Sequence, residues 1–381
     1  MIPYGRQEIT QEDIDQVTEV LKSDFLTQGP QVPIFEKNIS DYCGSKYSIA
    51  VNSSTSALHI ACMSLGLGKG DWLWTSPVTF VASANCGIYC GANVDFVDID
   101  PRTYNLCPKA LEAKLIKAKK QNCLPKIVVP VHLCGQSCDM KSIHDLSQKY
   151  GFKIIEDASH AVGGRYLDKP VGSCEYSDIA VFSFHPVKII TTGEGGMAMT
   201  NNSKVAKKMS ILRTHGITRD PNLMTKKPDG DWYYQQIELG HNYRITDIQA
   251  ALGISQFKRI NDIVSKRHFF AKRYDELLSD LPLQLPYQDH SVYSAFHLYV
   301  ILLNDSRNHK KVFDGLRKRD IGVNLHYIPV YRHPYYSKTI SSYDEYPESE
   351  KYYSSAISIP LYPSMSESDQ DEVIDAIKDL V

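Results

Sequence analysis

Short apolar runs alternate with amphipathic segments between residues 46 and 200, and this alternation constrains the fold more than any other feature of the chain. Runs such as residues 47–51 and 152–156 have the length and composition of buried strands, whereas intervening segments such as residues 140–150 have the longer spacing of helices. Chains that alternate in this way form a mostly parallel sheet with helices on both faces. We therefore predict an α/β fold with a large, doubly wound sheet domain.

The pattern changes at about residue 258, after which the segments fit a smaller α/β unit. The 381 residues are enough for one large domain and a smaller second one. We predict a large domain over residues 1–257 and a small C-terminal domain over residues 258–381. The strands expected in the small domain are residues 297–302, 322–326 and 356–359.

Two segments around this boundary carry separate expectations. Residues 219–240 contain proline, a Lys-Lys-Pro-Asp-Gly run and the aromatic triplet Trp-Tyr-Tyr, so we expect a long surface excursion, which is more often functional than idle. One helix is expected over residues 246–275, with Thr246 or Asp247 as its cap.

An amine and a carboxylate follow two of the predicted strands. Asp157 ends the strand at 152–156, and Lys188 lies five residues after Ser183, which ends another strand. Ligands of such sheets bind beyond the carboxyl ends of the strands, so we expect these side chains to reach one crevice. The pair matches what pyridoxal phosphate requires, because the amine forms a Schiff base with its aldehyde and the carboxylate holds a proton on its pyridine nitrogen. Burial would lower the pKa of Lys188 and leave an amine that can move a proton.

A serine-rich turn joins the strand at 47–51 to the helix that starts near Ala57. The free N–H groups of a helix N-terminus attract phosphate, and the hydroxyls of Ser54, Thr55 and Ser56 add donors. Ser183 is expected to add a further hydroxyl. An ordinary helix cap has the same composition, so both interpretations of the turn stay open.

Two further residues are candidates for contact with the pyridine ring. His160, three residues past Asp157, would contact the ring oxygen or stack on the ring, and a structural histidine is the alternative. Phe80 would cover one face of the ring, and packing in the core is the alternative.

Composition excludes several classes of protein. The formal net charge of −2 lacks the basic excess of a nucleic-acid-binding protein. No apolar stretch approaches the roughly 20 residues that span a bilayer, and residues 1–6 lack the apolar core of a signal peptide, so we expect a cytoplasmic protein. The spacing of Cys134 and Cys138 matches no common zinc signature, so no metal site is expected and the nine cysteines are interpreted as reduced and structural.

The motifs together resemble the DegT/DnrJ/EryC1/StrS family of aminotransferases, which are PLP-dependent sugar aminotransferases with the aspartate-aminotransferase fold (fold type I). The resemblance covers nearly the whole chain. In chain order the matching segments are residues 24–30, 54–58, 156–158, 183–188, 193–196, 213–216, 240–244 and 326–329.

The resemblance implies a role for each matching residue. Lys188 would carry the Schiff base and Asp157 would pair with the pyridine nitrogen. Asn242 would reach the phosphate in the neighbouring subunit, which implies a homodimer with shared active sites. The sequence departs from the family at Ser54, where glycine or alanine is frequent, and at His160, where many members have glutamine. The implied cofactor-binding residues are Ser54, Thr55, Ser56, Phe80, Asp157, His160, Ser183, Lys188 and Asn242, and the implied substrate-binding residues are Tyr4, Asp24, Phe25, Leu26, Thr27, Ser54, Ser183, Asn242, Arg244, His326, Tyr327, Ile328 and Pro329.

Within the family, residues 157–161, 183–192 and 322–329 are similar to members that act in pseudaminic acid biosynthesis. The resemblance implies transfer of the amino group of L-glutamate to C4 of a UDP-sugar, UDP-2-acetamido-2,6-dideoxy-β-L-arabino-hexos-4-ulose. Arg213 and Arg244 are candidates for binding a carboxylate.

Three alternatives remain open. The first is a sugar aminotransferase of different regiochemistry, epimer or nucleotide. The second is a PLP-dependent dehydratase, although such enzymes replace the Schiff-base lysine with histidine and this chain has Lys188. The third is a catalytically inactive protein that binds PLP or a sugar nucleotide.

Overall fold

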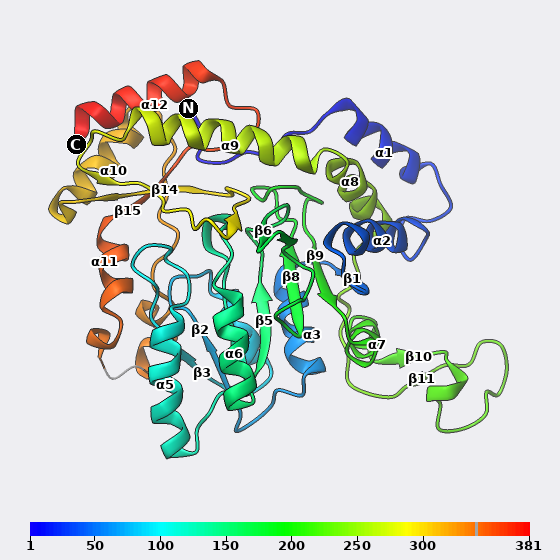
Figure 1. Ribbon diagram of the computed structural model, residues 1–381. Helices are drawn as coiled ribbons and strands as arrows, with labels where there is room; N and C mark the ends of the chain where they lie inside the picture. The colour runs from blue at the N-terminus through cyan, green and yellow to red at the C-terminus, as the bar shows by residue number, and fades with distance from the viewer. Residues whose placement is uncertain (340–341) are drawn as a thin grey trace.

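The computed structural model describes residues 1–339 and 342–381, and its centre is a seven-stranded sheet (Figure 1). The strand order is β1-β9-β8-β5-β4-β2-β3. Strands β8, β5, β4, β2 and β3 are parallel, and β9 is antiparallel to both of its neighbours. The predicted α/β fold with a mostly parallel sheet is confirmed. The strands are β1 (Tyr47–Val51), β2 (Trp72–Thr75), β3 (Asn93–Phe96), β4 (Ile127–Val129), β5 (Lys153–Asp157), β8 (Ile179–Ser183) and β9 (Gly196–Thr200).

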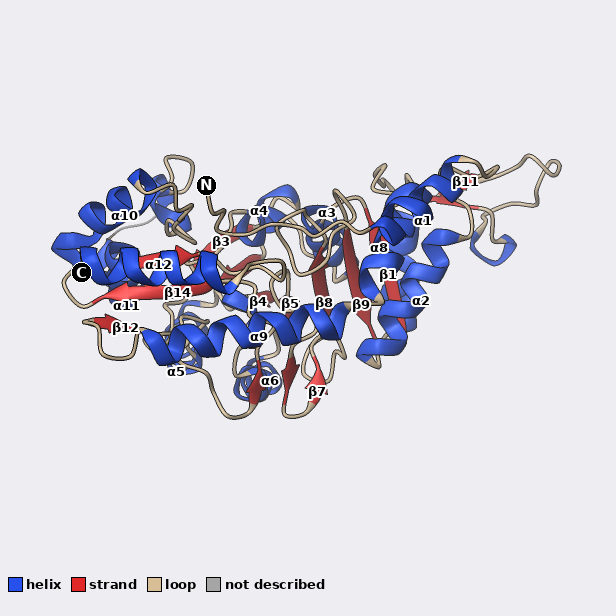
Figure 2. Ribbon diagram, turned by 90° about the horizontal axis from the view of Figure 1, so that it is seen from above, coloured by secondary structure: helices blue, strands red, loops and turns tan. Residues whose placement is uncertain are grey.

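Helices cover both faces of this sheet, as the view from above shows (Figure 2). Successive side chains of a strand point to opposite faces of the sheet, so neighbouring residues pack against different helices. Ile154 packs with α5 and α6 on one face, and Ile155 packs with α3, α4 and α7 on the other. The helices are α1 (Gln11–Leu21), α2 (Gln31–Cys43), α3 (Ser54–Ser64), α4 (Ala82–Tyr89), α5 (Pro108–Gln121), α6 (Met140–Tyr150), α7 (Ser203–Leu212), α8 (Asp247–Phe257), α9 (Ile260–Leu277), α10 (His309–Lys318), α11 (Pro347–Ser355) and α12 (Glu367–Leu380).

A second, antiparallel sheet has its own core, which includes residues of α9, α10 and α12. The strands expected at residues 297–302 and 356–359 are present as β14 and β15. The strand expected at residues 322–326 is absent, so that prediction is wrong. Asn324 makes only an isolated bridge to Ser358, since this segment continues into the wall of the central pocket. The smaller strands are β6 (Arg165–Tyr166), β7 (Lys169–Pro170), β10 (Ile217–Thr218), β11 (Gln235–Gln236), β12 (Leu283–Gln284), β13 (Val292–Tyr293), β14 (Tyr299–Leu303) and β15 (Ala356–Ile359).

The start of the chain packs into this second core. Ile2 is buried there and forms a parallel bridge with Ile321. Its N–H donates to the carbonyl of Asp320 at 2.8 Å, and its carbonyl accepts from Gly322 N–H at 2.7 Å. The first residues therefore belong by contact to the second core.

The single helix expected over residues 246–275 is wrong, because two helices, α8 and α9, meet at Lys258–Arg259. No proline or glycine marks the break. Arg259 instead leaves the helical conformation (φ −101°, ψ 9°) and donates to the buried carboxylate of Asp13 at 2.8 Å. The expected cap Thr246 is present and accepts from the N–H of Gln249.

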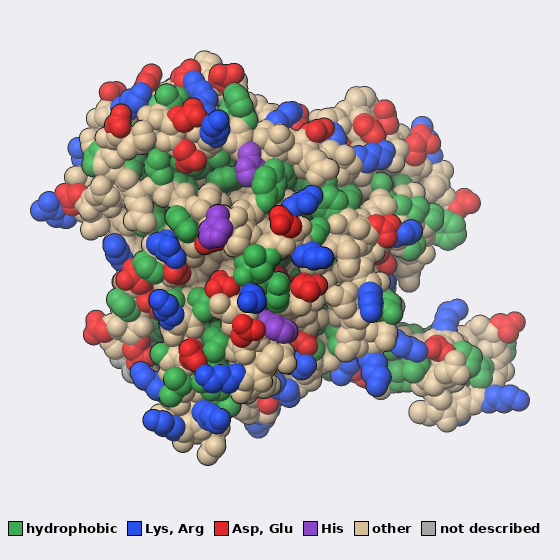
Figure 3. Space-filling view, in the orientation of Figure 1, with side chains coloured by type: hydrophobic (Ala, Val, Ile, Leu, Met, Phe, Trp, Pro, Cys, Tyr) green, Lys and Arg blue, Asp and Glu red, His purple; other side chains and the backbone are tan. Residues whose placement is uncertain are grey.

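Residues 219–240 lie in a hairpin lobe whose strands, β10 and β11, pair antiparallel. The lobe projects away from the rest of the molecule (Figure 1). Figure 3 shows basic and hydrophobic side chains on it. Trp232 is 74% exposed there. The expected surface excursion is therefore present. Elsewhere in the described chain, every helix is too short or too polar to cross a bilayer.

Candidate active site

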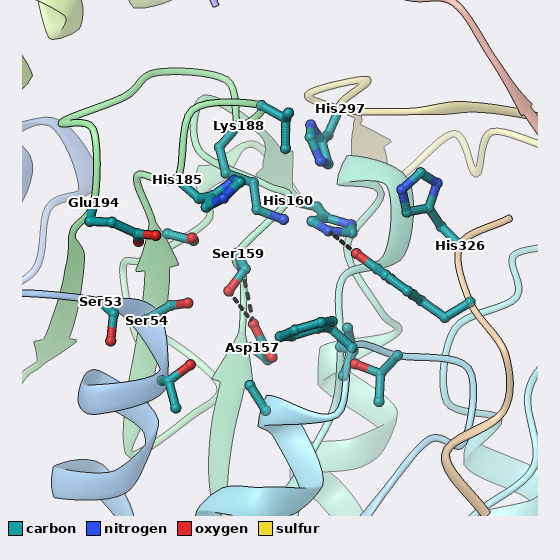
Figure 4. Close-up of a pocket in the computed structure, with 18 of the residues that line it drawn as sticks. Ser53, Ser54, Asp157, Ser159, His160, His185, Lys188, Glu194, His297 and His326 are labelled. Carbon is teal, nitrogen blue, oxygen red and sulfur yellow. Dashed lines mark hydrogen bonds between the residues drawn. The ribbon is translucent and has the colours of Figure 1, made fainter. Parts of the chain in front are cut away.

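A pocket of about 700 Å³ lies beyond the carboxyl ends of β1, β5 and β8 (Figure 4). This is where the sequence places a ligand. The predicted residues that line it are Tyr4, Ser54, Thr55, Ser56, Phe80, Asp157, His160, Ser183, Lys188, His326 and Tyr327.

The serine-rich turn forms one end of the pocket. Ser53 caps α3 by accepting a hydrogen bond from the N–H of Ser56 at 3.1 Å, which points the helix N-terminus at the cavity. Strand β9 passes directly behind the turn at Gly196, where a Cβ atom would lie 2.5 Å from the backbone nitrogen of Ser54. The turn thus offers helix N–H groups and hydroxyls to an anion, and the Ser183 hydroxyl faces the same space.

Asp157 lies at the bottom of the pocket and is 5% exposed. Its Oδ1 accepts from the Ser159 hydroxyl at 2.6 Å, and its Oδ2 accepts from the Ser83 hydroxyl at 2.6 Å. The described residues place no arginine or lysine within ion-pair distance of this carboxylate. The backbone N–H of Ser159 also donates to Oδ1, at 3.2 Å. A buried carboxylate held by neutral donors, without a cation, is suited to a cationic N–H of a ligand.

Lys188 projects into the pocket from the loop after β8, on the opposite side from α3 (Figure 4). Burial lowers the pKa of its amine to about 8, and the charge of Asp157 opposes this decrease. A minor fraction of the amine, about a tenth to a fifth, is therefore neutral at pH 7 to 7.4.

His160 is buried, and both of its ring nitrogens have partners. Its Nδ1 accepts from the backbone N–H of Cys134 at 3.3 Å, so its proton lies on Nε2, 3.2 Å from the hydroxyl of Tyr327. Burial, with Lys188 and His326 nearby, holds the pKa of His160 well below its ordinary value. The histidine is thus a neutral side chain that orients Tyr327.

His326 completes the same wall. Its Nε2 accepts from the Asn324 amide at 3.4 Å, which leaves the proton on Nδ1 for the hydroxyl of Ser358 at 2.8 Å. Burial, followed by the charge of Lys188, lowers the pKa of His326 to about 3. Phe80 also lines the pocket, with its ring centroid 6.1 Å from that of Tyr327. It is 58% exposed and is therefore not a core residue.

Several predicted site residues do not line this pocket. Residues 24–27 lie exposed in the loop between α1 and α2. This loop is anchored by a hydrogen bond from the N–H of Asp247 to the carbonyl of Leu26. Asn242 is exposed before α8, Ile328 is exposed, and Pro329 is buried beside the pocket wall.

The two candidate arginines have different surroundings. Arg213 donates to the carboxylate of Glu36 at 2.5 Å and to the carbonyl of Ala50 at 2.6 Å, so its guanidinium is used within the fold. Arg244 has no ion pair among the described residues and borders a separate pocket of about 350 Å³ that also includes Gln28.

The structure adds pocket residues that the sequence did not identify. They include Glu194 beside the serine-rich turn, and His185, Asn324 and His297. Glu194 lies in the glycine-rich segment at residues 193–196, but nothing in the sequence shows that it faces the cavity. His297 comes just before β14, about 110 residues from Lys188, and only packing brings them together.

Comparisons with known proteins cover the whole chain. The model of the DegT/DnrJ/EryC1/StrS aminotransferase family matches residues 7–378. The chain is 39% identical to the spore coat polysaccharide biosynthesis protein SpsC of Bacillus subtilis, over 100% of this chain and 97% of that protein. It is 38% identical to a UDP-4-amino-4,6-dideoxy-N-acetyl-beta-L-altrosamine transaminase of Campylobacter jejuni, over 99% and 96% of the two chains.

Solved structures give the same pattern. Helicobacter pylori PseC, described as an aminotransferase involved in the biosynthesis of pseudoaminic acid, superposes with a TM-score of 0.91 at 30% identity and covers 100% of this chain and 98% of that one. The PLP form of Streptococcus pneumoniae Spr1654 superposes with a TM-score of 0.89 at 27% identity, over 100% and 98% of the two chains.

Proposed function

Because this chain belongs to the DegT/DnrJ/EryC1/StrS aminotransferase family, we propose that it transfers the amino group of L-glutamate to C4 of UDP-2-acetamido-2,6-dideoxy-β-L-arabino-hexos-4-ulose in pseudaminic acid biosynthesis. Family members are PLP-dependent nucleotide-sugar aminotransferases. The observation that carries the proposal is the meeting of Lys188 and Asp157 in one pocket. The choice of sugar is supported by similarity to the C. jejuni transaminase and to PseC.

The pocket residues fit pyridoxal phosphate in their donor chemistry. The α3 N-terminus with Ser54, Thr55 and Ser56 would hold the phosphate, because an anion there gains unpaired helix N–H groups. Asp157, buried without a cation pair, would accept the ring N–H. Phe80 is exposed on the pocket wall and would cover one ring face.

Bound pyridoxal phosphate supplies an electron-accepting ring that stabilises negative charge on the carbon losing its proton. Asp157 keeps the ring nitrogen protonated. Lys188, with its pKa lowered to about 8, would take a proton from the glutamate α-carbon as a neutral amine and would later return it. The same residue acts in reverse on the keto sugar, so ping-pong kinetics are expected.

A homodimer belongs to this proposal. Asn242 and residues 24–27 lie exposed outside the pocket of their own chain, and exposed Phe25 and Leu26 are apolar. In the proposed dimer they reach the neighbouring subunit, where Asn242 contacts the phosphate. Arg244, which has no ion pair in the described chain, is the candidate for an anionic group of the substrate there.

A second candidate is amination of a different nucleotide sugar by the same chemistry. The chain is as similar to SpsC (39% identity) as it is to the C. jejuni transaminase (38% identity), and this favours the second candidate. Both candidates use the same pocket and differ only in the sugar and nucleotide.

One experiment separates them. Purified holoenzyme with L-glutamate is offered the L-arabino 4-keto sugar nucleotide and its D-xylo epimer, and the new amine is located by NMR. Amination of the L-arabino substrate at C4 is expected. Preference for the epimer, or amination at another carbon, would overturn the substrate assignment, and absence of 2-oxoglutarate with every sugar would overturn the function.

A further inference from the structure

His297 lines the pocket beside His160 and has no hydrogen bond from its ring to any described residue (Figure 4). The side chain is 4% exposed, and Nδ1 is among the buried atoms without a partner. Buried polar atoms in native proteins nearly always have a partner, because an unpaired one loses its hydrogen bonds to water. An unpaired imidazole that faces a cavity indicates a ligand that completes it.

The backbone of His297 is fixed from two sides, so the ring position is built into the fold. Arg267 is fully buried and donates to the carbonyls of Phe296 and His297, each at 3.1 Å. Gly135, at φ 102°, packs against the same segment, where a Cβ atom would lie 3.0 Å from the nitrogen of His297. These contacts hold the main chain and leave the ring nitrogens unused.

The other two imidazoles of this wall are already paired. His160 contacts Cys134 and Tyr327, and His326 contacts Asn324 and Ser358. The His160 and His297 rings lie 4.3 Å apart between centroids. Of the three histidines, only His297 therefore has neither ring nitrogen hydrogen-bonded to a described residue, and because Nδ1 is buried, Nε2 is the nitrogen left for a ligand.

The chemistry of that ligand follows from charge. Burial, followed by the nearby His160, Lys188 and Arg267, holds the pKa of His297 well below its ordinary value, so the ring is neutral with one donor and one acceptor. Among the described residues that line the pocket, Lys188 is the only lysine or arginine. A carboxylate or phosphate at His297 would meet no pocket-lining cation other than Lys188, since the guanidinium of Arg267 is buried against backbone carbonyls, whereas a hydroxyl or carbonyl matches a neutral imidazole.

We propose that His297 binds an uncharged oxygen, hydroxyl or carbonyl, of the sugar ring, and that it recognises the sugar and not the amino donor. The inference deepens the proposed function and rests on it. His297 thereby contributes to the second half-reaction, in which the keto sugar enters, and has little effect on the first, which glutamate alone completes.

Two variants test this role. His297→Phe keeps a planar ring and removes both nitrogens, whereas His297→Gln keeps a polar amide near Nε2, the nitrogen that is not among the buried unpaired atoms. The KM for the 4-keto sugar nucleotide is expected to rise about tenfold in His297→Phe and to recover in large part in His297→Gln. The glutamate half-reaction, followed alone by the absorbance change of the cofactor, is expected to stay within about twofold.

A binding measurement makes the test independent of turnover. Calorimetry with borohydride-reduced holoenzyme, which cannot react, should show about tenfold weaker binding of the 4-amino sugar nucleotide to His297→Phe. Equal losses in both half-reactions, or unchanged sugar affinity, would overturn the inference while wild-type turnover of the sugar upholds the proposed function. A wild type that aminates no sugar nucleotide would overturn both.

Discussion

The hydroxyl of Ser83, on α4, donates to Oδ2 of Asp157 at 2.6 Å, and both side chains are buried. This bond crosses from a helix on one face of the sheet to the end of β5. It fixes the carboxylate that would face the ring nitrogen, so α4 contributes to the site through a residue that does not line the pocket.

Replacement of Ser83 by alanine tests this support. A buried hydrogen bond to a charged group contributes about 1.5–3 kcal/mol, so Ser83→Ala should lower the free energy of unfolding by an amount in that range and weaken PLP binding. Ser64→Ala is a matched control, because Ser64 donates only within its own helix, to Ala61. Denaturant unfolding and cofactor titration are the measurements. Equal effects of the two substitutions would contradict the role of Ser83.

Replacement of Lys188 by arginine should abolish the covalent adduct with PLP and reduce turnover at least about 100-fold, because a guanidinium neither forms the adduct nor releases a proton near neutral pH. The adduct is read by borohydride trapping and peptide mapping. Lys153→Arg, at an exposed ion pair on β5, is the control and should behave as wild type. A label at another lysine would refute the assignment.

The depressed pKa of Lys188 also predicts how the apoprotein responds to pH. The unfolded chain holds this proton up to about pH 10.5, whereas the folded chain releases it near pH 8. Between these values the unfolded state binds more protons, so stability rises with pH, and below pH 8 the cost of the buried ammonium is fully present. Lys188→Met should therefore stabilise the apoprotein at pH 7 by about 1–3 kcal/mol. The gain should shrink as the pH rises above 8 in thermal unfolding, and a gain independent of pH would contradict this explanation.

The proposed sharing of sites between subunits predicts complementation. Lys188→Arg and Asn242→Ala are each expected to lose activity, yet a heterodimer of the two has one site with Lys188 and Asn242 both intact. Random mixing makes half of the dimers heterodimers, so coexpression should restore about a quarter of wild-type activity. Activity no greater than the sum of the separate variants would show that Asn242 does not act across subunits.

The two arginines should separate stability from function. Arg213 is part-buried with Glu36 and Ala50, so Arg213→Ala should reduce the free energy of unfolding by about 1–3 kcal/mol. Arg244→Ala removes no ion pair of the described chain and should change stability by less than about 0.5 kcal/mol while raising a substrate KM. Denaturant unfolding and steady-state kinetics on both variants decide this, and the reverse pattern would contradict it.

The sequence predicted the sheet and the position of the pocket because both depend on local patterns. The strand period shows where β5 and β8 end, next to Asp157 and Ser183, and the serine-rich turn after β1 is likewise visible within a few consecutive residues. The parallel pairing of β5 and β8 then brings the two side chains to one edge.

Other features depend on contacts distant in sequence. At the helix break, Arg259 contacts Asp13, 246 residues away, and no local residue marks the break. The sequence indicates the same role, binding of a carboxylate, for Arg213 and Arg244. The structure distinguishes them, because Arg213 is paired with the carboxylate of Glu36. His297 lies in an apolar run typical of a strand, and its neighbour His160 is more than 130 residues earlier.

The pairing of Ile2 with Ile321, within the second core, has a practical consequence. Tyr4, two residues later, lines the pocket, and its carbonyl accepts from the N–H of Leu361 at 3.1 Å. An affinity tag fused directly before Met1 would disturb the position of a segment that borders the substrate cavity. A tag after Val381, beyond α12, leaves that segment undisturbed and is the safer choice for kinetic work.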